Sequence, residues 1–189
     1  MGDKLIWEPH AVLFPMPTVI ISTAYEGKET VDTCAWLMPV NLDPPMIALA
    51  LRPKYLSWEY IKQSGEFAVN IPYENQTEFT DYCVRTSGYT EDKLCETGCN
   101  VFYGKHIKAP LLSDSIINME CAVKETYEIG GTHSIFVAEV LQTYFDEKIV
   151  VDRDCDNLND AVSLQNAKGI AYVMGEYWNL GHCIGLRSE

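Results

Sequence analysis

The sequence predicts a mainly β protein that folds as an antiparallel barrel with a few flanking helices. Three observations support this fold class: apolar and β-branched runs follow one another through short turns, a later stretch alternates with a period of two, and few segments have helical spacing. The chain has 189 residues with 47% hydrophobic composition, which is enough for one domain with a real core. We therefore expect residues 1–189 to form a single domain.

The first half of the chain contains four expected strands, which are short apolar runs bounded by turn residues: 18–25, 30–37, 46–51 and 67–71. A Glu-Gly-Lys-Glu turn joins the first two strands into a hairpin. A short helix over residues 57–64 separates the last two strands, and Gly65 marks its end. The spacing of a capping box predicts another helix that begins at Asn75 and packs as a lid or flank.

The second half returns to β structure from Ser115 onward. Apolar and polar residues alternate there, with Ile117, Met119, Cys121 and Val123 on one face and Asn118, Glu120 and Lys124 on the other. This pattern predicts a half-exposed strand. Gly130-Gly131 permits a tight connection to a long return strand over residues 134–145. Residues 146–160 are polar and acidic, as expected of a surface loop.

Charge and composition exclude several classes of partner. The net charge of −13 and the pI near 4.6 disfavour nucleic acid and anionic membranes. The first residues lack the pattern of a secretory leader, and no run approaches the roughly 20 apolar residues of a membrane helix. We therefore expect a cytoplasmic protein with no nucleic-acid or membrane partner.

The cysteines and one acidic motif were weighed as metal sites. Seven cysteines lack paired spacing and are interpreted as reduced thiols. Cys95 and Cys99 would share a helix face, but a metal site of this kind needs two more soft ligands nearby, so ordinary packing is favoured over a metal role. Residues 152–160 resemble the start of a calcium loop, but Asn157 and Ser163 stand where that loop needs Gly and a bidentate Glu. No metal site is predicted.

The segment between residues 38 and 57 has the chemistry of an anion site. Its prolines, at positions 39, 44 and 45, hold the chain extended and disfavour a central strand, so backbone amides are expected to stay free for a ligand. Arg52 and Lys54 meet Ser57 at the start of the expected helix, which suits an anion. Two plainer interpretations stay open: a solvated Arg-Pro-Lys loop, and Asn41 as a simple turn residue.

These motifs closely resemble those of the flavoredoxin and flavin reductase-like proteins with the FMN-binding split-barrel fold. The resemblance extends over residues 10–145 and is carried by Met-Pro-Val-Asn-Leu-Asp-Pro-Pro at 38–45, Arg-x-x-x-x-Ser at 52–57 and Ser-Gly-Glu-Phe-Ala-Val-Asn-Ile-Pro at 64–72. It implies a six-stranded, antiparallel Greek-key split barrel. It also implies a homodimer that holds one FMN per subunit.

The resemblance and the needs of a flat, phosphorylated ligand assign the candidate site residues. The ring wall and ring donors would come from Thr33, Cys34, Ala35, Trp36, Val40, Asn41 and Leu42, and the phosphate anchor from Arg52, Tyr55, Ser57 and Tyr60. Lys62 is a possible outer charge of this anchor. Tyr177-Trp178 would either cover the ring, across a dimer interface, or dock onto the chain's own core.

His133 is the candidate catalytic residue. It follows Gly131-Thr132 and so resembles the Gly-x-His motif that lies near the flavin in this family. A role in orienting the nicotinamide or stabilising reduced flavin is expected, against the alternative of a structural or exposed histidine.

The expected activity is that of an NAD(P)H-dependent FMN oxidoreductase, which transfers hydride from NADH or NADPH to FMN. The alternative is a non-enzymatic, flavoredoxin-type electron carrier that receives electrons from another redox protein; the acidic composition would suit a basic partner. Sequence alone does not separate these two functions.

Overall fold

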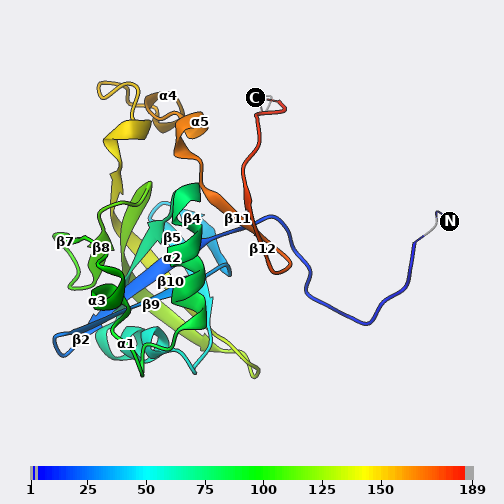
Figure 1. The fold of residues 1–189 in the computed structure, drawn as a ribbon, viewed down its shortest axis with the longest axis vertical. Helices are drawn as coiled ribbons and strands as arrows, with labels where there is room; N and C mark the ends of the chain where they lie inside the picture. The colour runs from blue at the N-terminus through cyan, green and yellow to red at the C-terminus, as the bar shows by residue number, and fades with distance from the viewer. Residues whose placement is uncertain (1, 3, 186–189) are drawn as a thin grey trace.

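The computed structural model describes residues 2 and 4–185. Figure 1 shows a β-barrel body with α1, α2 and α3 on its outside, and an N-terminal segment that extends away from the body. Residues 180–185 also leave the body, beyond the hairpin of β11 and β12. The protein is mainly β, as the sequence predicted.

The main sheet has seven strands in the order β3-β2-β6-β9-β10-β5-β4, and every neighbouring pair is antiparallel. The strands are β2 (Val19–Tyr25), β3 (Lys28–Cys34), β4 (Leu37–Leu42), β5 (Pro45–Leu51), β6 (Glu66–Ile71), β9 (Ile117–Glu128) and β10 (Ser134–Phe145). The predicted number of six strands is wrong. The proline-containing segment forms a seventh strand at the sheet edge, a position that tolerates the missing N–H of Pro39. The Greek-key connectivity stays a prediction.

The two edges of this sheet are joined by a short piece of chain. β3 ends at Cys34 on one edge, and three residues later Leu37 begins to pair with β5 on the other edge. The backbone N–H of Ala50 donates to the carbonyl oxygen of Trp36 at 2.9 Å, which extends the β4–β5 ladder by one bond, and the Cys34 thiol at the end of β3 donates to the carbonyl oxygen of Ala50 in β5 at 3.7 Å. The sheet therefore bends round until β3 and β5 meet, which closes the barrel at residues 34–37.

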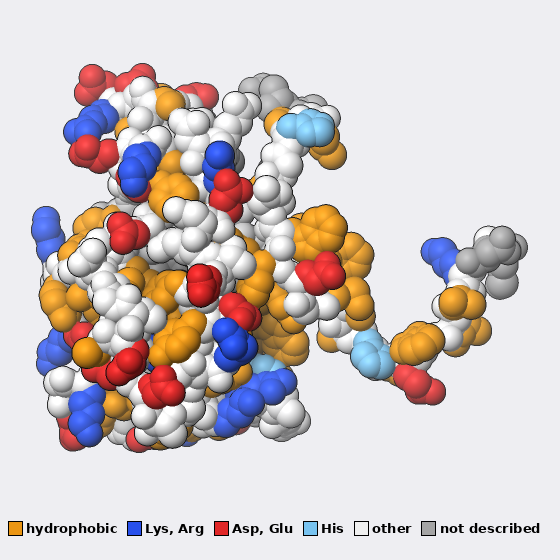
Figure 2. Space-filling model, in the orientation of Figure 1, with side chains coloured by type: hydrophobic (Ala, Val, Ile, Leu, Met, Phe, Trp, Pro, Cys, Tyr) orange, Lys and Arg blue, Asp and Glu red, His pale blue; other side chains and the backbone are white. Residues whose placement is uncertain are grey.

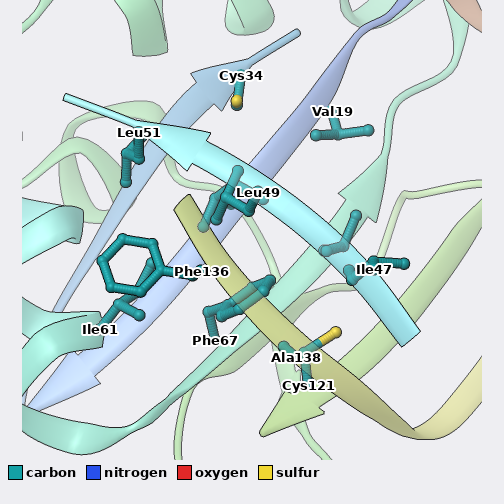
Figure 3. Packing of buried hydrophobic residues seen from close by; sticks show 12 residues of the cluster. Val19, Cys34, Ile47, Leu49, Leu51, Ile61, Phe67, Cys121, Phe136 and Ala138 are labelled. Atoms are coloured by element: carbon teal, nitrogen blue, oxygen red, sulfur yellow. The ribbon is translucent and has the colours of Figure 1, made fainter. Parts of the chain in front are cut away.

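The barrel interior is a single apolar cluster, seen from close by in Figure 3. Its buried members are Val19, Ile21, Cys34, Ile47, Leu49, Leu51, Ile61, Phe67, Val69, Cys121, Phe136 and Ala138. All come from the main sheet except Ile61, which the helix after β5 supplies. A second cluster, which includes Ile20, Val31 and Cys83, packs α2 against the outside of β2 and β3.

The helices lie close to their predicted positions. α1 (Leu56–Ser64) ends at Gly65, whose φ of 73° is left-handed and whose N–H donates to Ile61. The predicted start at Asn75 falls inside a 3-10 turn, η1 (Glu74–Gln76), which leads into α2 (Thr77–Arg85). The remaining elements are β1 (Met16–Pro17), α3 (Lys93–Thr97), β7 (Val101–Tyr103), β8 (Pro110–Leu112), η2 (Glu147–Ile149), α4 (Leu158–Ala161), α5 (Leu164–Ala167), β11 (Ile170–Val173) and β12 (Glu176–Asn179).

The prediction that β9 exposes its polar face is wrong at Asn118 and Glu120, which are both buried. The Glu120 carboxylate accepts the backbone N–H groups of residues 105–107 and the hydroxyl of Tyr144. Gly104 also lies against it, because a Cβ at that position would sit 2.2 Å from a carboxylate oxygen. Glu120 thus anchors a distant loop, and its partners lie outside the reach of a local sequence pattern.

The acidic segment 146–160 contains η2 and most of α4, and apart from Ile149 its described side chains are exposed or half-buried. The described cysteines are all free thiols. Within the described residues, no group of three or more His, Cys, Asp or Glu is arranged to hold a metal ion. No helix of the described chain has the length and apolar character needed to cross a membrane.

Candidate functional site

A cleft of about 470 Å³ opens where the barrel closes on itself. It is lined by Thr18, Thr33, Cys34, Ala35, Trp36, Ala50, Leu51, Arg52, Tyr55, Asp81, Val84, His133, Tyr172, Gly175 and Tyr177. These residues come from the end of β3 and the positions after it, from the end of β5 and the positions up to α1, from α2, from the hairpin β11–β12, and from the positions just before β2 and β10. The volume lies within the range of roughly 300–1,000 Å³ that is usual for small-molecule sites.

A polar group stands on one side of the cleft. Arg52 Nε donates to His133 Nε2 at 3.4 Å, and Thr132 Oγ1 lies 2.7 Å from His133 Nδ1. Because Arg52 Nε always carries its proton, Nε2 is the acceptor and the imidazole proton is assigned to Nδ1, facing Thr132. Burial and the nearby Arg52 guanidinium lower the pKa of His133. His133 is therefore held neutral at pH 7.

An aromatic stack continues from this polar group. The indole of Trp36 and the imidazole of His133 are nearly parallel, with centroids 4.4 Å apart and planes 20° apart. Tyr55 lies in the same cleft, and burial raises the pKa of its phenol although Arg52 opposes the shift. The cleft thus offers flat apolar surfaces beside a cation.

Arg52 in the cleft and the nearby Lys54 have no acidic partner among the described residues. Of the ion pairs formed among residues 2 and 4–185, none involves Arg52 or Lys54. Lys54 Nζ instead lies 5.3 Å from the centroid of the Tyr55 ring. In a chain with a net charge of −13, an uncompensated Arg52 in the cleft lining, with Lys54 next to the lining residue Tyr55, favours an anionic ligand.

The barrel side of the cleft is neutral. Thr33 donates to the carbonyl oxygen of Thr80 at 2.6 Å, and the Cys34 thiol points to the carbonyl oxygen of Ala50 at 3.7 Å. Burial raises the pKa of Cys34 to about 12, so the group stays a thiol. Thr18 Oγ1 is buried in this wall and finds no hydrogen-bond partner in the described part of the chain.

The C-terminal hairpin forms the remaining wall. The hydroxyl of Tyr177 donates to Asp81 at 3.4 Å, and Asp81 also pairs with Arg85 at 2.5 Å. Burial, with the Asp81 charge, raises the pKa of Tyr177 to about 12. Of the two residues singled out in this region, Tyr177 lines the cleft of its own chain, whereas Trp178 is 55% exposed and lies outside it.

The structure brings seven of the sequence-predicted site residues together in this cleft: Thr33, Cys34, Ala35, Trp36, Arg52, Tyr55 and His133. Three others, Val40, Asn41 and Leu42, lie along the exposed edge strand β4. The Asn41 side chain donates to the carbonyl oxygen of Pro44 at 2.8 Å, as expected of a turn residue. Most of this segment pairs with β5, so its backbone is not the free loop that the prolines predicted.

Ser57 and Tyr60 do not line the cleft. Tyr60 lies by Tyr25, with ring centroids 6.0 Å apart. The Ser57 hydroxyl donates to Asp32 at 2.5 Å within a fully buried group. Lys93 Nζ pairs with the other oxygen of Asp32 at 2.5 Å. Ser57 therefore binds a carboxylate behind the cleft.

Lys93 joins several elements behind the cleft. Besides Asp32, its ammonium donates to the carbonyl oxygens of Val31 at 2.7 Å and Cys83 at 2.9 Å. Asp32 precedes the cleft residue Thr33, and Cys83 precedes the cleft residue Val84. The buried ion pair thus fixes β3 and α2 next to the cleft.

Sequence reasoning missed several cleft residues: Thr18, Ala50, Leu51, Asp81, Val84, Tyr172 and Gly175. A signal existed for Asp81 and Val84, which are three residues apart on the helix expected as a lid or flank. Tyr172 and Gly175 carried no signal, because they lie beyond the segment that resembled a known family.

Residues 11–155 of the chain match the family model described as "Flavin reductase like domain". A crystal structure of flavoredoxin from Methanosarcina acetivorans is similar, with a TM-score of 0.86 and 28% identity over 97% of this chain and 95% of that chain. An uncharacterized protein of Pyrococcus abyssi is 26% identical over 141 residues, which is 75% of this chain and 80% of that protein.

A further relative is the reductase component of 4-nitrophenol 4-monooxygenase/4-nitrocatechol 2-monooxygenase from Rhodococcus opacus. It is 29% identical over 129 residues, which is 68% of this chain and 65% of that protein. The family model spans well over half of the chain and includes most of the cleft residues. The resemblance found in the sequence is thereby confirmed, and the chain belongs to the flavin reductase-like family.

Proposed function

We propose that this chain is an FMN-binding oxidoreductase, which works as a single-domain, cytoplasmic homodimer and reduces FMN with NADH or NADPH. One observation carries the proposal: Arg52, which lines a cleft with aromatic and apolar walls, and the neighbouring Lys54 form no ion pair with any residue that the structure describes. The family match and the reductase component from Rhodococcus opacus support the redox part of the proposal.

The cleft residues fit FMN. Trp36, Tyr55 and Tyr177 provide flat surfaces for a tricyclic ring, and Arg52 provides a planar guanidinium for a phosphate. Thr18 adds a buried hydroxyl that has no partner within residues 2 and 4–185, and a polar atom of a ligand would satisfy it. When bound, FMN would supply the hydride-accepting chemistry that no side chain of the cleft offers.

The role that we assign to His133 is to orient the nicotinamide. Its Nε2 accepts from Arg52 and its Nδ1 faces Thr132, so both ring nitrogens already have partners. Its lowered pKa keeps it neutral at pH 7, which argues against a role as proton donor. His133 would thus act by positioning the nicotinamide. The indole of Trp36, which stacks on the imidazole of His133, would hold that imidazole in place.

A second candidate function is electron carriage without turnover of NADH or NADPH. The similarity to flavoredoxin from Methanosarcina acetivorans, at 28% identity and a TM-score of 0.86, favours it. The net charge of −13 would suit a basic redox partner. In this case the cleft would hold FMN in the same way, and only the electron donor would differ.

The purified protein separates these functions. Its visible spectrum, before and after titration with FMN, should show bound oxidised flavin. Steady-state oxidation of NADH and NADPH with added FMN should then show turnover if the protein is a reductase, whereas bound FMN without turnover would support the carrier. A colourless protein that takes up no FMN would overturn both.

A further inference from the structure

The N-terminal arm, defined here as residues 4–14, is apolar and extended. In Figure 1 this segment leaves the body, and Figure 2 shows hydrophobic side chains along it. Its large apolar side chains are all exposed: Leu5, Ile6, Trp7, Val12, Leu13 and Phe14. Three of them are almost bare, with exposed fractions of 93% for Leu5, 98% for Ile6 and 79% for Trp7. Such an apolar segment in water marks a contact surface.

No hydrogen bond of the described residues ties the arm to the body of its own subunit. The bonds found in the described part of the arm are local, such as Val12 N–H to His10 O at 3.1 Å and His10 Nδ1 to Glu8 O at 2.8 Å. The arm joins the body at β1, which pairs with β11 of the cleft hairpin. The arm therefore starts beside the cleft and has its side chains free for another surface.

The edge strand β4 is a second exposed apolar surface. It pairs with β5 on one side only, and it carries Trp36, at its start, with Met38, Val40 and Leu42 exposed along it. Leu42 is 91% exposed. A free sheet edge with apolar side chains is a site for contact with another chain.

We propose that the arm of one subunit packs over the β4 edge of a second copy of this chain, and that the second copy returns the same contact. This inference rests on the homodimer of the proposed function and names the segments that form it. Each chain carries both surfaces, so a two-fold axis pairs arm with edge strand twice, which closes the assembly. The arm would then end beside Trp36 and cover the mouth of its partner's cleft.

The reach of the arm fits this arrangement. Its eleven residues span at most about 36 Å when extended, at about 3.3 Å per residue. The six residues of β4 occupy about 20 Å on the same scale. The arm is therefore long enough to cover β4 and still reach Trp36, which lines the cleft.

The comparison with flavoredoxin from Methanosarcina acetivorans supports a defined role for the arm. That superposition covers 97% of the chain, which leaves about six of the 189 residues outside it. Since the arm has eleven residues, at least part of it has a counterpart in that crystal structure. The family model, by contrast, begins only at residue 11. At least part of the arm is thus shared with flavoredoxin, while most of the arm lies outside the matched reductase domain.

The first test removes the apolar tip of the arm. The variant Leu5→Ser/Ile6→Ser/Trp7→Ser should keep its fold, because these side chains are exposed in the subunit. Sedimentation velocity over a range of protein concentrations should show a wild-type dimer and a dimer dissociation constant raised at least 100-fold in the variant. The matched control, Val151→Ser/Leu158→Ser, changes exposed apolar residues elsewhere and should leave the dimer intact.

A photo-crosslink identifies the surface that the arm contacts. A benzophenone amino acid replaces Trp7 in an equal mixture of ¹⁴N- and ¹⁵N-labelled chains, and crosslinked peptides are identified by mass spectrometry. Crosslinks to the peptide that contains residues 36–42, in mixed-isotope pairs, are expected. A monomeric wild type, an unchanged dimer in the triple variant, or crosslinks confined to one chain would each overturn the inference.

These measurements are made without flavin, so they separate the two proposals. If the triple variant dissociates while the wild type takes up no FMN, the arm contact stands and the flavin function fails. If FMN binds and is reduced, but the triple variant dimerises as the wild type does, the flavin function stands and the arm contact fails.

Discussion

Two cations near the cleft, Lys93 and Arg52, differ in how completely the protein satisfies them. The side chain of Lys93 has no exposed surface, and three oxygen atoms surround its ammonium at 2.5–2.9 Å. Arg52 is exposed, has one long bond of 3.4 Å to His133, and pairs with no carboxylate of the described chain. A fully bonded buried charge fixes the fold, whereas a cation with spare donors is available to a ligand.

The largest effect should follow from Lys93→Met, which leaves the Asp32 carboxylate buried without its cation. We expect the free energy of unfolding to fall by about 3–5 kcal/mol, measured by urea denaturation. Lys124→Met is the control, because Lys124 pairs with Glu139 at a half-exposed site and should cost no more than about 1 kcal/mol. Equal losses in the two variants would remove the distinction between the buried and the exposed cation.

A second prediction extends the comparison to a buried anion. Burial alone would raise the pKa of Glu120, but hydrogen bonds from Tyr144 and from the backbone of residues 105–107 outweigh it and hold the pKa below its ordinary value. Glu120→Gln should reduce the free energy of unfolding by about 1.5–3 kcal/mol at pH 7, because charge-assisted bonds are lost.

The pH dependence gives a separate check on Glu120. Because its folded pKa is depressed, the carboxylate contributes stability that is fully present above its ordinary pKa of about 4.3 and is lost as pH falls through the folded value. Thermal melts between pH 6 and pH 3 should therefore show a steeper loss in the wild type than in Glu120→Gln. Parallel curves would contradict the assignment.

Arg52→Gln tests the opposite case, a cation with a role in binding. We expect FMN affinity to fall about 10-fold or more, because a charged hydrogen bond to phosphate is worth about 1.5–3 kcal/mol. Riboflavin, which lacks the phosphate, should lose much less, and the free energy of unfolding should stay within about 0.5 kcal/mol of wild type. Fluorescence titration with both flavins measures the difference, and equal losses would refute the anchor.

The smallest expected effect concerns His133. Burial is the larger cause of its lowered pKa and Arg52 the smaller, so Arg52→Gln removes only the smaller cause. In the wild type, the midpoint of any His133-linked change in reduction rate should lie below pH 6.5. In Arg52→Gln it should move upward toward that value. A midpoint that moves downward would show that Arg52 does not act on His133 through its charge.

Local patterns predicted most of the fold. The run at 134–145 matches β10 at both ends, and the expected helix 57–64 differs from α1 by one residue. In both segments the side-chain pattern and the flanking residues determine the element. Pro39 was correctly excluded from a central strand, but its place at a sheet edge depends on how the barrel closes.

The rest depended on contacts between distant residues. Glu120 was predicted to face solvent, because its partners lie 13 to 24 residues further along or back in the chain. Ser57 looked like a ligand-binding hydroxyl, but its hydroxyl donates a hydrogen bond to Asp32, 25 residues earlier. Tyr172 and Tyr177 of the last hairpin line the cleft only because the fold brings that hairpin next to the barrel. When a site lies where several elements meet, the sequence predicts only those site residues that are close together along the chain.

The closure of the barrel at residues 34–37 has a consequence for motion. Neighbouring strands of the main sheet are joined by backbone ladders, but β3 and β5 share no such ladder in the described chain: they approach at residues 34–37, where the Cys34 thiol donates to the carbonyl oxygen of Ala50 and the N–H of Ala50 makes the last bond of the β4–β5 ladder, to Trp36. A short seam separates at a lower free energy than a full ladder. Amide hydrogen exchange at Ala50 should therefore be faster than at Leu49, and flavin at the seam would slow it. The weakest line of the barrel wall thus coincides with the mouth of the cleft.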